Sequence, residues 1–404
     1  MHHPAFAALI FSLLLAAAAQ VRADEVVRWN RVMTDVSAAA DTDPLTESRA
    51  FAIVHAAMHD ALNAIERRYE PYRAETAAAP GASPEAAIAG AAHASLVALM
   101  PELKPAFDQA LADTLERVSD RRAAFAGLET GRKAAAVVLA ARRDDGASRK
   151  VVHVAGKKPG EYRPTPPDFT PGAFAQWGAI RPFVLKSSAQ FRPVPPLAPS
   201  SKRARIEADE VRAIGGKDSS TRNAEQSEIA RFWYEHSTQG WNRVAREVAV
   251  AQNLDAWESA RLLALVNFAM ADGFIGGFEA KYHFNYWRPA TAIRETSDAS
   301  WLPYLGTPPV PDYPSTHTVL GAAAAAVLAR FFGTDHVAFS MTSGAPYGGI
   351  TRRFWSFSEA AQENGASRIL AGIHFATAVR AGYTQGEQIG AWTYERSLRP
   401  VRQD

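Results

Sequence analysis

Hydrophobic positions recur at helical spacing over most of this chain, while the alternation typical of strands is scarce. In the first half the spacing predicts four helices, over residues 43–66, 84–99, 104–118 and 120–143. In the second half it predicts four more, over residues 227–236, 241–252, 256–286 and 319–332. Asp43 and Pro44 fit the N-cap and the first turn of the first helix. We therefore predict an all-α fold.

A proline-rich segment interrupts this helical pattern between residues 158 and 200. Its ten prolines exclude both a helix interior and a central strand, because proline lacks the backbone N–H that either would need. The segment also contains Trp177 and Phe183, which favour packing against the protein over a solvated linker. We expect a long ordered loop, here called the belt.

The length of 404 residues fits one large domain or two halves. We divide the chain into a signal segment over residues 1–23, an N-terminal helical half with the belt over 24–200, and a C-terminal helical bundle over 201–404. A single compact domain over 24–404 is the alternative division.

Charge and cysteine content exclude several classes of function. The 44 Lys and Arg are scattered among 42 Asp and Glu, for a net charge of +2, so no basic stripe is available for nucleic acid. The chain has no cysteine, which excludes disulfides and thiolate ligands. Nucleic acid is therefore not an expected partner.

The N-terminus resembles a secretory signal. Residues 5–19 are almost wholly apolar, and Val21-Arg22-Ala23 offers small residues where a signal peptidase cuts, so we expect cleavage before Asp24. An uncleaved anchor is the competing interpretation. No later segment is predicted to be long and apolar enough to span a bilayer. The expected location is secreted or periplasmic.

Three short clusters in the second half carry the candidate chemistry. The first holds Lys281 and Arg288, seven positions apart, followed by Pro289. Seven residues are about two helical turns, so both cations would emerge on one helical face, with an anion between them. A solvated pair at a helix end is the alternative for this cluster alone.

The second cluster is Pro314-Ser315-Thr316-His317, directly before an alanine-rich helix. The free N–H groups and positive dipole of a helix N-terminus suit an anion, to which the Ser315 hydroxyl can also donate. His317 lies where it could pass protons to a bound oxygen. Taken alone, such a histidine is more often structural or solvated.

The third cluster is Ser367-Arg368 with His374. On an ideal helix Ser367 and His374 share one face, and Arg368 reaches sideways from about 120° away. An Arg and a His at this spacing are also common by chance.

Taken together, the order K-x6-RP, PSxH and SRx5H resembles the signature shared by the vanadium-dependent haloperoxidases and the type 2 phosphatidic acid phosphatase superfamily. The likeness to secreted bacterial haloperoxidase-like proteins extends to residues 49–60, 287–293 and 356–361. It implies haloperoxidase-like helical bundles, with the anion site in the second bundle.

The resemblance also implies a role for each matching residue. Lys281, Arg288 and Arg368 would neutralise the oxygens of the anion. Ser315 and the backbone N–H of Thr316 would donate hydrogen bonds to it. The implied cofactor is vanadate, and phosphate is expected to compete because the two share shape and charge.

Two histidines would then carry the reaction. His317 would be the acid–base group, and His374 would bind the central atom, as ligand to vanadium or as nucleophile on phosphorus. The implied activity is oxidation of a halide by hydrogen peroxide. The alternatives are a secreted acid phosphatase acting on phosphate esters and a non-catalytic protein that binds phosphate or vanadate.

The chain departs from the family pattern at two positions. Thr316 stands where glycine is usual, and its side chain is expected to crowd the pocket. Ala378 stands where an aspartate commonly follows the last histidine by four residues, so the tautomer of His374 must be fixed by another group. We expect this loss to harm phosphatase chemistry more than vanadate ligation.

Other ionisable groups have structural interpretations. His55 and His59, beside Asp60, have a spacing that could bind zinc, but no third ligand is evident and a role in or behind the core is favoured. Asp272 and Glu279 share one face of the helix leading to Lys281. We expect these carboxylates to pair with Arg288 or Arg368.

Overall fold

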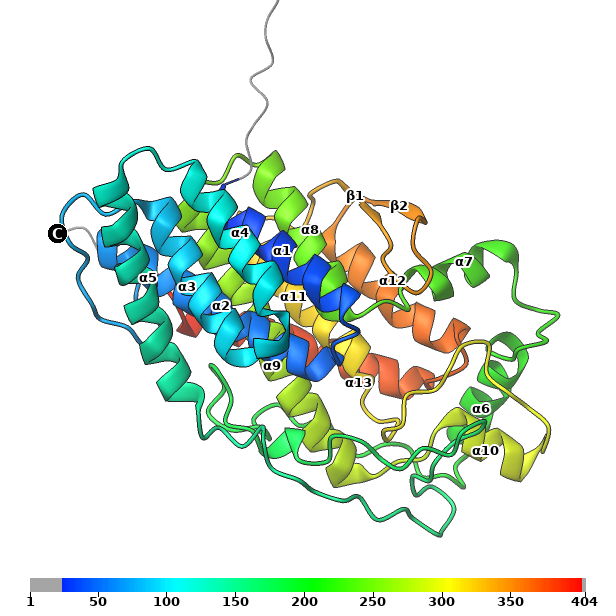
Figure 1. Cartoon of the computed structure of the whole chain (residues 1–404). Helices are drawn as coiled ribbons and strands as arrows, with labels where there is room; N and C mark the ends of the chain where they lie inside the picture. The colour runs from blue at the N-terminus through cyan, green and yellow to red at the C-terminus, as the bar shows by residue number, and fades with distance from the viewer. Residues whose placement is uncertain (1–23, 402–404) are drawn as a thin grey trace, which may run out of the picture.

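The computed structural model describes residues 24–401, and these form thirteen α-helices with one short two-stranded hairpin (Figure 1). The all-α prediction is confirmed. The predicted signal segment, residues 1–23, lies outside the described residues. Cleavage before Asp24 and export therefore stay predictions, as does the division near residue 200.

The helices follow one another along the chain as follows. The first five are α1 (Glu25–Ala39), α2 (Pro44–Ile65), α3 (Pro84–Leu99), α4 (Lys104–Glu116) and α5 (Arg121–Arg142). The next five are α6 (Lys202–Ile214), α7 (Ala224–Phe232), α8 (Ser237–Ala251), α9 (Ala256–Phe284) and α10 (Pro289–Thr296). The last three are α11 (Thr316–Phe332), α12 (Phe357–Leu370) and α13 (Ala376–Arg396).

Between α11 and α12, strands β1 (Phe339–Thr342) and β2 (Thr351–Phe354) pair antiparallel. All eight predicted helices are present, with their ends shifted by a few residues. The hydrophobic spacing does not predict α1, α6, α10, α12 or α13. In α13 the signal is masked by glycines, which weaken helix propensity and have no side chain to mark a buried face.

Helix α9 is the central element of the fold, and in Figure 1 it passes between the N-terminal helices and α11. It packs against α2, α8, α11 and α13. Its 29 residues are long and apolar enough to cross a bilayer, which corrects the expectation that no later segment is. However, 94% of its most apolar window is buried inside the protein, so it is a core helix.

The belt is ordered, as predicted, and contains only one short 3₁₀ turn, Trp177–Ala179. Trp177 and Phe183 are buried in the main hydrophobic core. Figure 1 shows the belt running along one edge of the helices. It is fixed to α9 by Asp272, whose carboxylate accepts the backbone N–H groups of Phe183, Val184 and Leu185 at 2.7, 2.8 and 2.9 Å.

This placement corrects the expectation for the two carboxylates of α9. Asp272 binds the belt, and Glu279 forms an ion pair with Arg192. Neither carboxylate reaches Arg288 or Arg368. Asp272 is completely buried, and three backbone donors from an irregular segment satisfy it, so its role is structural.

The histidines of α2 also have structural partners. His55 contacts the side chain of Asn30 through Nε2 at 2.7 Å. Asp60 accepts the backbone N–H groups of residues 72–74 at 2.6–2.8 Å. His59 lies beside Asp60 and Asn63. Within residues 24–401 no group of three His, Asp or Glu side chains is arranged to hold a metal. The side-chain and backbone contacts of His55, His59 and Asp60 place them in the core.

Helix α13 lies unusually close to α11 because glycine recurs every fourth residue on the contacting face. A Cβ atom at Gly382, Gly386 or Gly390 would lie within 2.5 Å of a backbone oxygen of α11 or of Ser315. No side chain fits at such a distance. The backbones therefore meet directly, and this contact fixes the N-terminus of α11 against α13.

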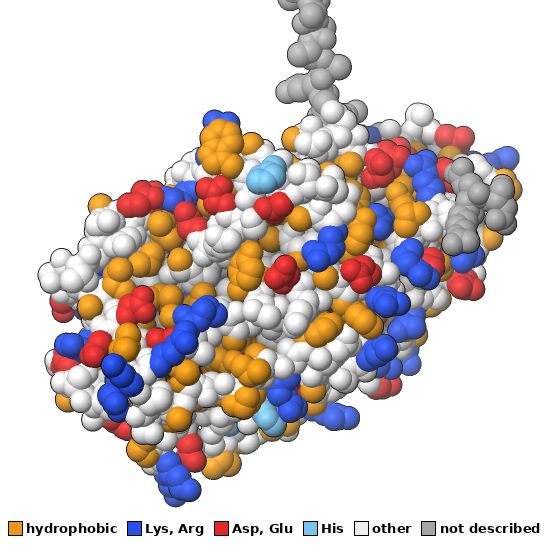
Figure 2. Space-filling model, turned by 180° about the vertical axis from the view of Figure 1, so that it is seen from behind, with side chains coloured by type: hydrophobic (Ala, Val, Ile, Leu, Met, Phe, Trp, Pro, Cys, Tyr) orange, Lys and Arg blue, Asp and Glu red, His pale blue; other side chains and the backbone are white. Residues whose placement is uncertain are grey.

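Charged side chains are interspersed over the surface. On the face shown in Figure 2, Lys and Arg alternate with Asp and Glu without a patch of one sign.

Candidate active site

The first cluster is divided between two elements. Helix α9 ends at Phe284, and Asn285 takes the left-handed conformation, with φ 48°, that caps it. Lys281 lies in the last turn of α9, whereas Arg288 precedes α10, which begins with Pro289. The prediction that Lys281 and Arg288 share one helical face is wrong, because Asn285 turns the chain between them.

The third cluster is divided as well. Arg368 lies in the last turn of α12, and His374 lies in the connection to α13. Gly372 makes the turn between them with φ 79°, and a Cβ atom there would lie 2.1 Å from the carbonyl oxygen of Gly215. The helical geometry expected from Ser367 to His374 is therefore wrong, since the turn requires glycine and ends the helix.

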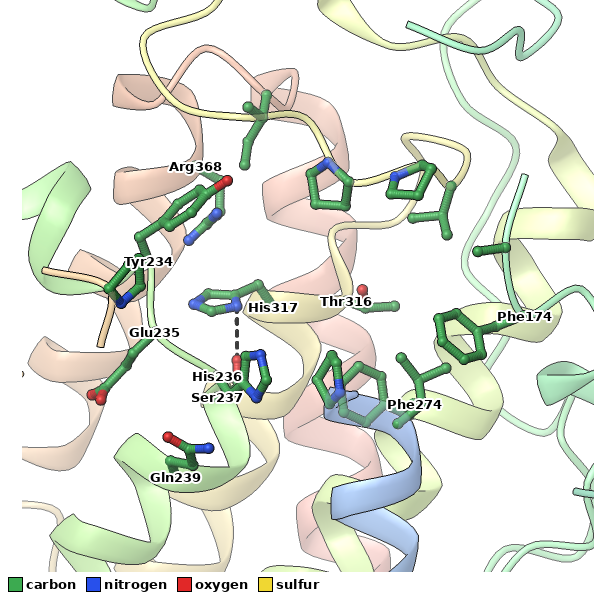
Figure 3. A pocket seen from close by; sticks show the side chains of 18 of the residues that line it. Phe174, Tyr234, Glu235, His236, Ser237, Gln239, Phe274, Thr316, His317 and Arg368 are labelled. Atoms are coloured by element: carbon green, nitrogen blue, oxygen red, sulfur yellow. Dashed lines mark hydrogen bonds between the residues drawn. The ribbon is translucent and has the colours of Figure 1, made fainter. Parts of the chain in front are cut away.

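Despite these breaks the three clusters meet at one cavity of about 520 Å³. Arg288, Thr316, His317, Arg368 and His374 line it. The other two predicted residues, Lys281 and Ser315, are completely buried behind its wall. Figure 3 shows His317 and Arg368 on one side of the cavity, with Phe174 and Phe274 on the other. The cavity therefore joins a cationic end to an apolar wall.

Arg288 is held by carbonyl groups and an imidazole. Its Nε donates to the carbonyl of Val310 and its Nη1 to the carbonyl of Ile373, both at 2.7 Å. The same Nη1 lies 3.0 Å from Nε2 of His374. The nearest carboxylate oxygen, from Asp312, is 3.9 Å away.

Lys281 and Arg368 have even fewer negative partners. The ammonium group of Lys281 donates to the carbonyls of Pro311 and Asp312 at 2.7 and 3.1 Å. Arg368 donates from Nη1 to the carbonyl of Trp233 at 2.8 Å, and its buried Nε has no partner among the described residues. Over the described part of the chain, neither cation has a carboxylate within 4.0 Å.

The electrostatics reflect this excess of positive charge. Burial and the neighbouring charge of Arg288 lower the pKa of Lys281 well below its usual value. Burial lowers the pKa of Arg368 to about 10. Burial, followed by the charges of Arg288, Lys281 and Arg368, lowers the pKa of His374. A bound anion would relieve all of these repulsions.

The N-terminus of α11 faces the same place. Ser315 is its N-cap, but its side chain does not cap the helix; it accepts a hydrogen bond from the hydroxyl of Thr318 at 2.9 Å. Its backbone N–H donates to the carbonyl of Ala378. The Ser315 proton and the first N–H groups of the helix are thus not used by a side-chain cap and remain suitable for an anion.

Thr316 is accommodated by a glycine on α9. A Cβ atom at Gly277 would lie 2.5 Å from the methyl carbon of Thr316, so that methyl group occupies space that only glycine leaves open. The expected crowding is therefore partly relieved by Gly277.

His317 is half-buried and projects into the cavity. Its Nδ1 lies 2.8 Å from the hydroxyl of Ser237, the first residue of α8, as the dashed line in Figure 3 shows. Burial, reinforced by the charge of Arg368, lowers the pKa of His317. The imidazole is therefore neutral near pH 7 and able to accept a proton. Sequence reasoning does not identify Ser237, because no local motif marks it.

Asp312 is a second residue that sequence reasoning does not assign. It is completely buried, and its Oδ1 lies 2.8 Å from Nδ1 of His374. Burial raises the pKa of Asp312 to about 7, although Arg288 and Lys281 act in the opposite direction. The only signal was its position two residues before Pro314 in the second cluster.

These groups fit a tetrahedral oxyanion such as vanadate or phosphate. Three buried cations face one nearby carboxylate, and a guanidinium nitrogen of Arg368 has no partner within residues 24–401. Rigid cationic donors and a helix N-terminus are what a multiply charged anion needs. One imidazole, His374, presents a nitrogen to the same cluster and could bind the central atom.

Comparisons of the sequence point to one family. A profile described as the VCPO second helical-bundle domain matches residues 261–403. The vanadium chloroperoxidase of Curvularia inaequalis is 27% identical over the aligned part, which covers 33% of this chain and 32% of that enzyme. This chain is thus matched to about a third of that enzyme's length.

The structural comparison covers nearly the whole chain. A bacterial vanadium-dependent iodoperoxidase superposes with a TM-score of 0.84 at 28% identity, over 94% of this chain and 98% of that one. Apo and holo structures of bacterial vanadium-dependent chloroperoxidase give TM-scores of 0.75 and 0.69 at 18% and 19% identity. They cover 87% of this chain and 94% and 91% of their own, and show the same fold. These sequence and structural matches are all to vanadium-dependent haloperoxidases, and they support the predicted resemblance to the superfamily of vanadium-dependent haloperoxidases and type 2 phosphatidic acid phosphatases.

Proposed function

We propose that this chain is a haloperoxidase-like enzyme that binds vanadate between Lys281, Arg288 and Arg368 and oxidises a halide with hydrogen peroxide. The observation that carries the proposal is the unbalanced charge of the site: among the described residues, Arg288 alone of the three buried cations has a carboxylate within 4.0 Å, that of Asp312, while Glu235 in the cavity wall is paired with Arg243. Buried charges are normally paired, so this excess indicates an anionic ligand.

His374 would hold the anion. Its Nε2 receives a donor from Arg288, which means that the lone pair of this nitrogen is on the side of the cations. Bound vanadate would supply a Lewis-acid centre that activates peroxide. The cations and the N-terminus of α11 would neutralise and orient its oxygens.

His317 would move protons at the cavity. It is neutral near pH 7 because burial lowers its pKa, and it faces the same cavity as His374. It could therefore take a proton from hydrogen peroxide and return one to a leaving oxygen. Ser237 contacts Nδ1 and so orients the ring of His317 for this exchange.

Phosphate ester hydrolysis is the second candidate, and one contact favours it. A histidine nucleophile needs a group that fixes its tautomer, and Asp312 lies 2.8 Å from Nδ1 of His374. The alanine at position 378 therefore does not count against a phosphatase, because Asp312 places a carboxylate beside His374. The preference for halide oxidation rests on the likeness to the iodoperoxidase over 94% of this chain.

The test is an assay of the full-length purified protein with and without added vanadate. Iodide and bromide oxidation would be followed with hydrogen peroxide, and hydrolysis would be followed with an aryl phosphate. We expect halide oxidation that depends on vanadate. Hydrolysis inhibited by vanadate would instead establish the phosphatase, and silence in both assays with anion binding would establish a non-catalytic binding protein.

The site assignment is tested by His374→Ala in the same assays. We expect complete loss of activity, because His374 is the imidazole that lies between Arg288 and Asp312 at the buried cations. His336→Ala, at an exposed histidine beyond the far end of α11, is the matched control and should keep full activity. Full activity in His374→Ala would remove the assignment.

A further inference from the structure

The carboxylate that commonly follows the last histidine of the superfamily signature is absent from this chain, where Ala378 takes its position. Ala378 lies in the first turn of α13, is buried, and accepts the backbone N–H of Ser315 through its carbonyl. His374 is nevertheless not left without an acid partner. Asp312, from the segment before α11, lies 2.8 Å from its Nδ1.

The partners of His374 also specify its tautomer. Nη1 of Arg288 lies 3.0 Å from Nε2 and 3.5 Å from Nδ1, so its shorter contact is with Nε2, and a guanidinium group can only donate. This contact favours Nε2 as the acceptor and the ring proton on Nδ1, the nitrogen 2.8 Å from Oδ1 of Asp312. Both carboxylate oxygens of Asp312 are buried and have no other hydrogen-bond partner among the described residues. In this arrangement the lone pair that could bind vanadium or attack phosphorus is on the side of the cations.

Asp312 is itself fixed by the first cluster. Its backbone N–H donates to the carbonyl of Tyr286 at 2.9 Å, and its carbonyl accepts the ammonium group of Lys281 at 3.1 Å. Its side chain has no exposed surface. Lys281 thus positions the backbone of Asp312, and Asp312 reaches His374, so the three clusters form one chain of contacts.

We infer that Asp312 is the positioning residue of His374, and that it supplies from the segment before α11 the carboxylate that relatives carry on the helix after the histidine. The inference rests on the proposed function in one respect, that His374 is the residue that binds the anion. Asp312 acts through His374 and does not touch the anion. Outer partners of this kind orient metal-binding histidines and typically change affinity by about 10–100-fold when removed.

A purely electrostatic role is the alternative, because Asp312 is also 3.9 Å from Arg288. In that case the carboxylate would only offset buried positive charge. Its removal would then tighten anion binding, since more positive charge would remain, and the tautomer of His374 would not change. The two roles therefore predict opposite changes in affinity.

The first measurement uses the unmodified protein. Long-range ¹H–¹⁵N spectra of histidine-labelled protein report which ring nitrogen carries the proton, and His374→Ala identifies the signal. We expect protonated Nδ1 and unprotonated Nε2. The opposite tautomer would overturn the inference without any change at Asp312, and the result does not depend on which reaction the protein catalyses.

The second measurement is the affinity of Asp312→Asn for phosphate and for vanadate, by titration calorimetry. We expect both to weaken by about 10–100-fold, with loss of the single tautomer. Asp272→Asn is the matched control: it removes another buried carboxylate but should change neither affinity nor tautomer. Unchanged or tighter binding in Asp312→Asn would contradict the inference.

The third measurement moves the carboxylate back to α13. Asp312 and Ala378 border one further cavity of about 590 Å³, which gives the side chain of an aspartate at 378 room beside the position of Asp312. The double variant Asp312→Ala with Ala378→Asp should bind phosphate within about threefold of the unmodified protein, whereas Asp312→Ala alone should not. Equal weakening in both variants, with the His374 tautomer unchanged in both, would overturn the positioning role.

Discussion

Two buried arginines show how differently this molecule treats charge in its framework and at its candidate site. Arg142, at the end of α5, is 2% exposed, and Arg368, in α12, is 4% exposed. Arg142 lies 2.9 Å from the carboxylate of Asp145, donates to the belt carbonyls of Arg181 and Pro182, and stacks over Phe183. Arg368 has one carbonyl partner and a longer contact with the ring of Tyr234, and no carboxylate among residues 24–401 is within ion-pair distance.

This difference separates buried charges that are balanced within the fold from buried charges that need a bound ligand to balance them. Removing a charge from water costs several kcal/mol, and Arg142 recovers this cost within the protein. Arg368 does not, and the same holds for Lys281. A fold keeps such groups only if something outside the chain balances them. Unbalanced burial therefore identifies the site more directly than any single motif.

Arg368→Met is expected to give the largest effect. Affinity for phosphate and vanadate should fall by about 1,000-fold, equivalent to about 4 kcal/mol, because a fixed cation facing the anion is lost. In the absence of anion, the free energy of unfolding should stay equal or rise, since an incompletely satisfied buried charge has been removed. Calorimetric titration and urea unfolding measure the two quantities. A large loss of stability with unchanged affinity would break the comparison.

Arg142→Met should give the reverse pattern. It removes one of the two arginines that pair with Asp145, the other being Arg49, and it leaves the belt carbonyls without donors, so we expect a loss of about 3 kcal/mol in unfolding free energy. Anion affinity should stay within twofold. The same two measurements apply, and an equal fall in affinity at 142 and at 368 would mean that the site is sensitive to any buried charge.

The third prediction concerns His55, a buried histidine of the framework that becomes an unpaired cation when it is protonated. Burial lowers the pKa of His55 to about 3, against 6.5 for the unfolded chain. Above pH 6.5 neither state binds the proton, so stability does not depend on this group. Below pH 6.5 only the unfolded state binds it, and stability falls by about 1.4 kcal/mol per pH unit, or about 2 kcal/mol by pH 5.

Urea unfolding between pH 7 and 5 measures this slope. His55→Gln should flatten it by about 1.4 kcal/mol per pH unit. His336→Gln, at an exposed histidine, should leave it unchanged. The same slope in all three proteins would show that protonating the buried histidine costs nothing, and would weaken the comparison.

Many residues of the candidate site can be predicted from the sequence, because the chemistry they offer depends on residue type. The seven motif residues from Lys281 to His374 do gather at one cavity or directly behind its wall. The local geometry was not visible. Helical spacing placed Lys281 and Arg288 on one face, yet Asn285 ends α9 between them. A left-handed residue at a helix end leaves little trace in hydrophobic periodicity.

The partners of His317 and His374 could not be predicted from the sequence, for a different reason. Ser237 is 80 positions from His317, and Asp312 is 62 positions from His374. A serine and an aspartate are common residues, and nothing local distinguishes those that reach an imidazole. Likewise, the sequence predicts that Asp272 pairs with Arg288 or Arg368. Tertiary packing instead places its carboxylate against the belt.

The sequence by itself determined the helical class, the ordered belt and the set of charged groups that can surround an oxyanion, because periodicity and residue chemistry are local properties. The tertiary structure alone decided which nitrogen of His374 is held and by which carboxylate, and which buried charges are balanced. These depend on contacts between segments far apart in the chain, whose free energy is set by burial and geometry that no short pattern records.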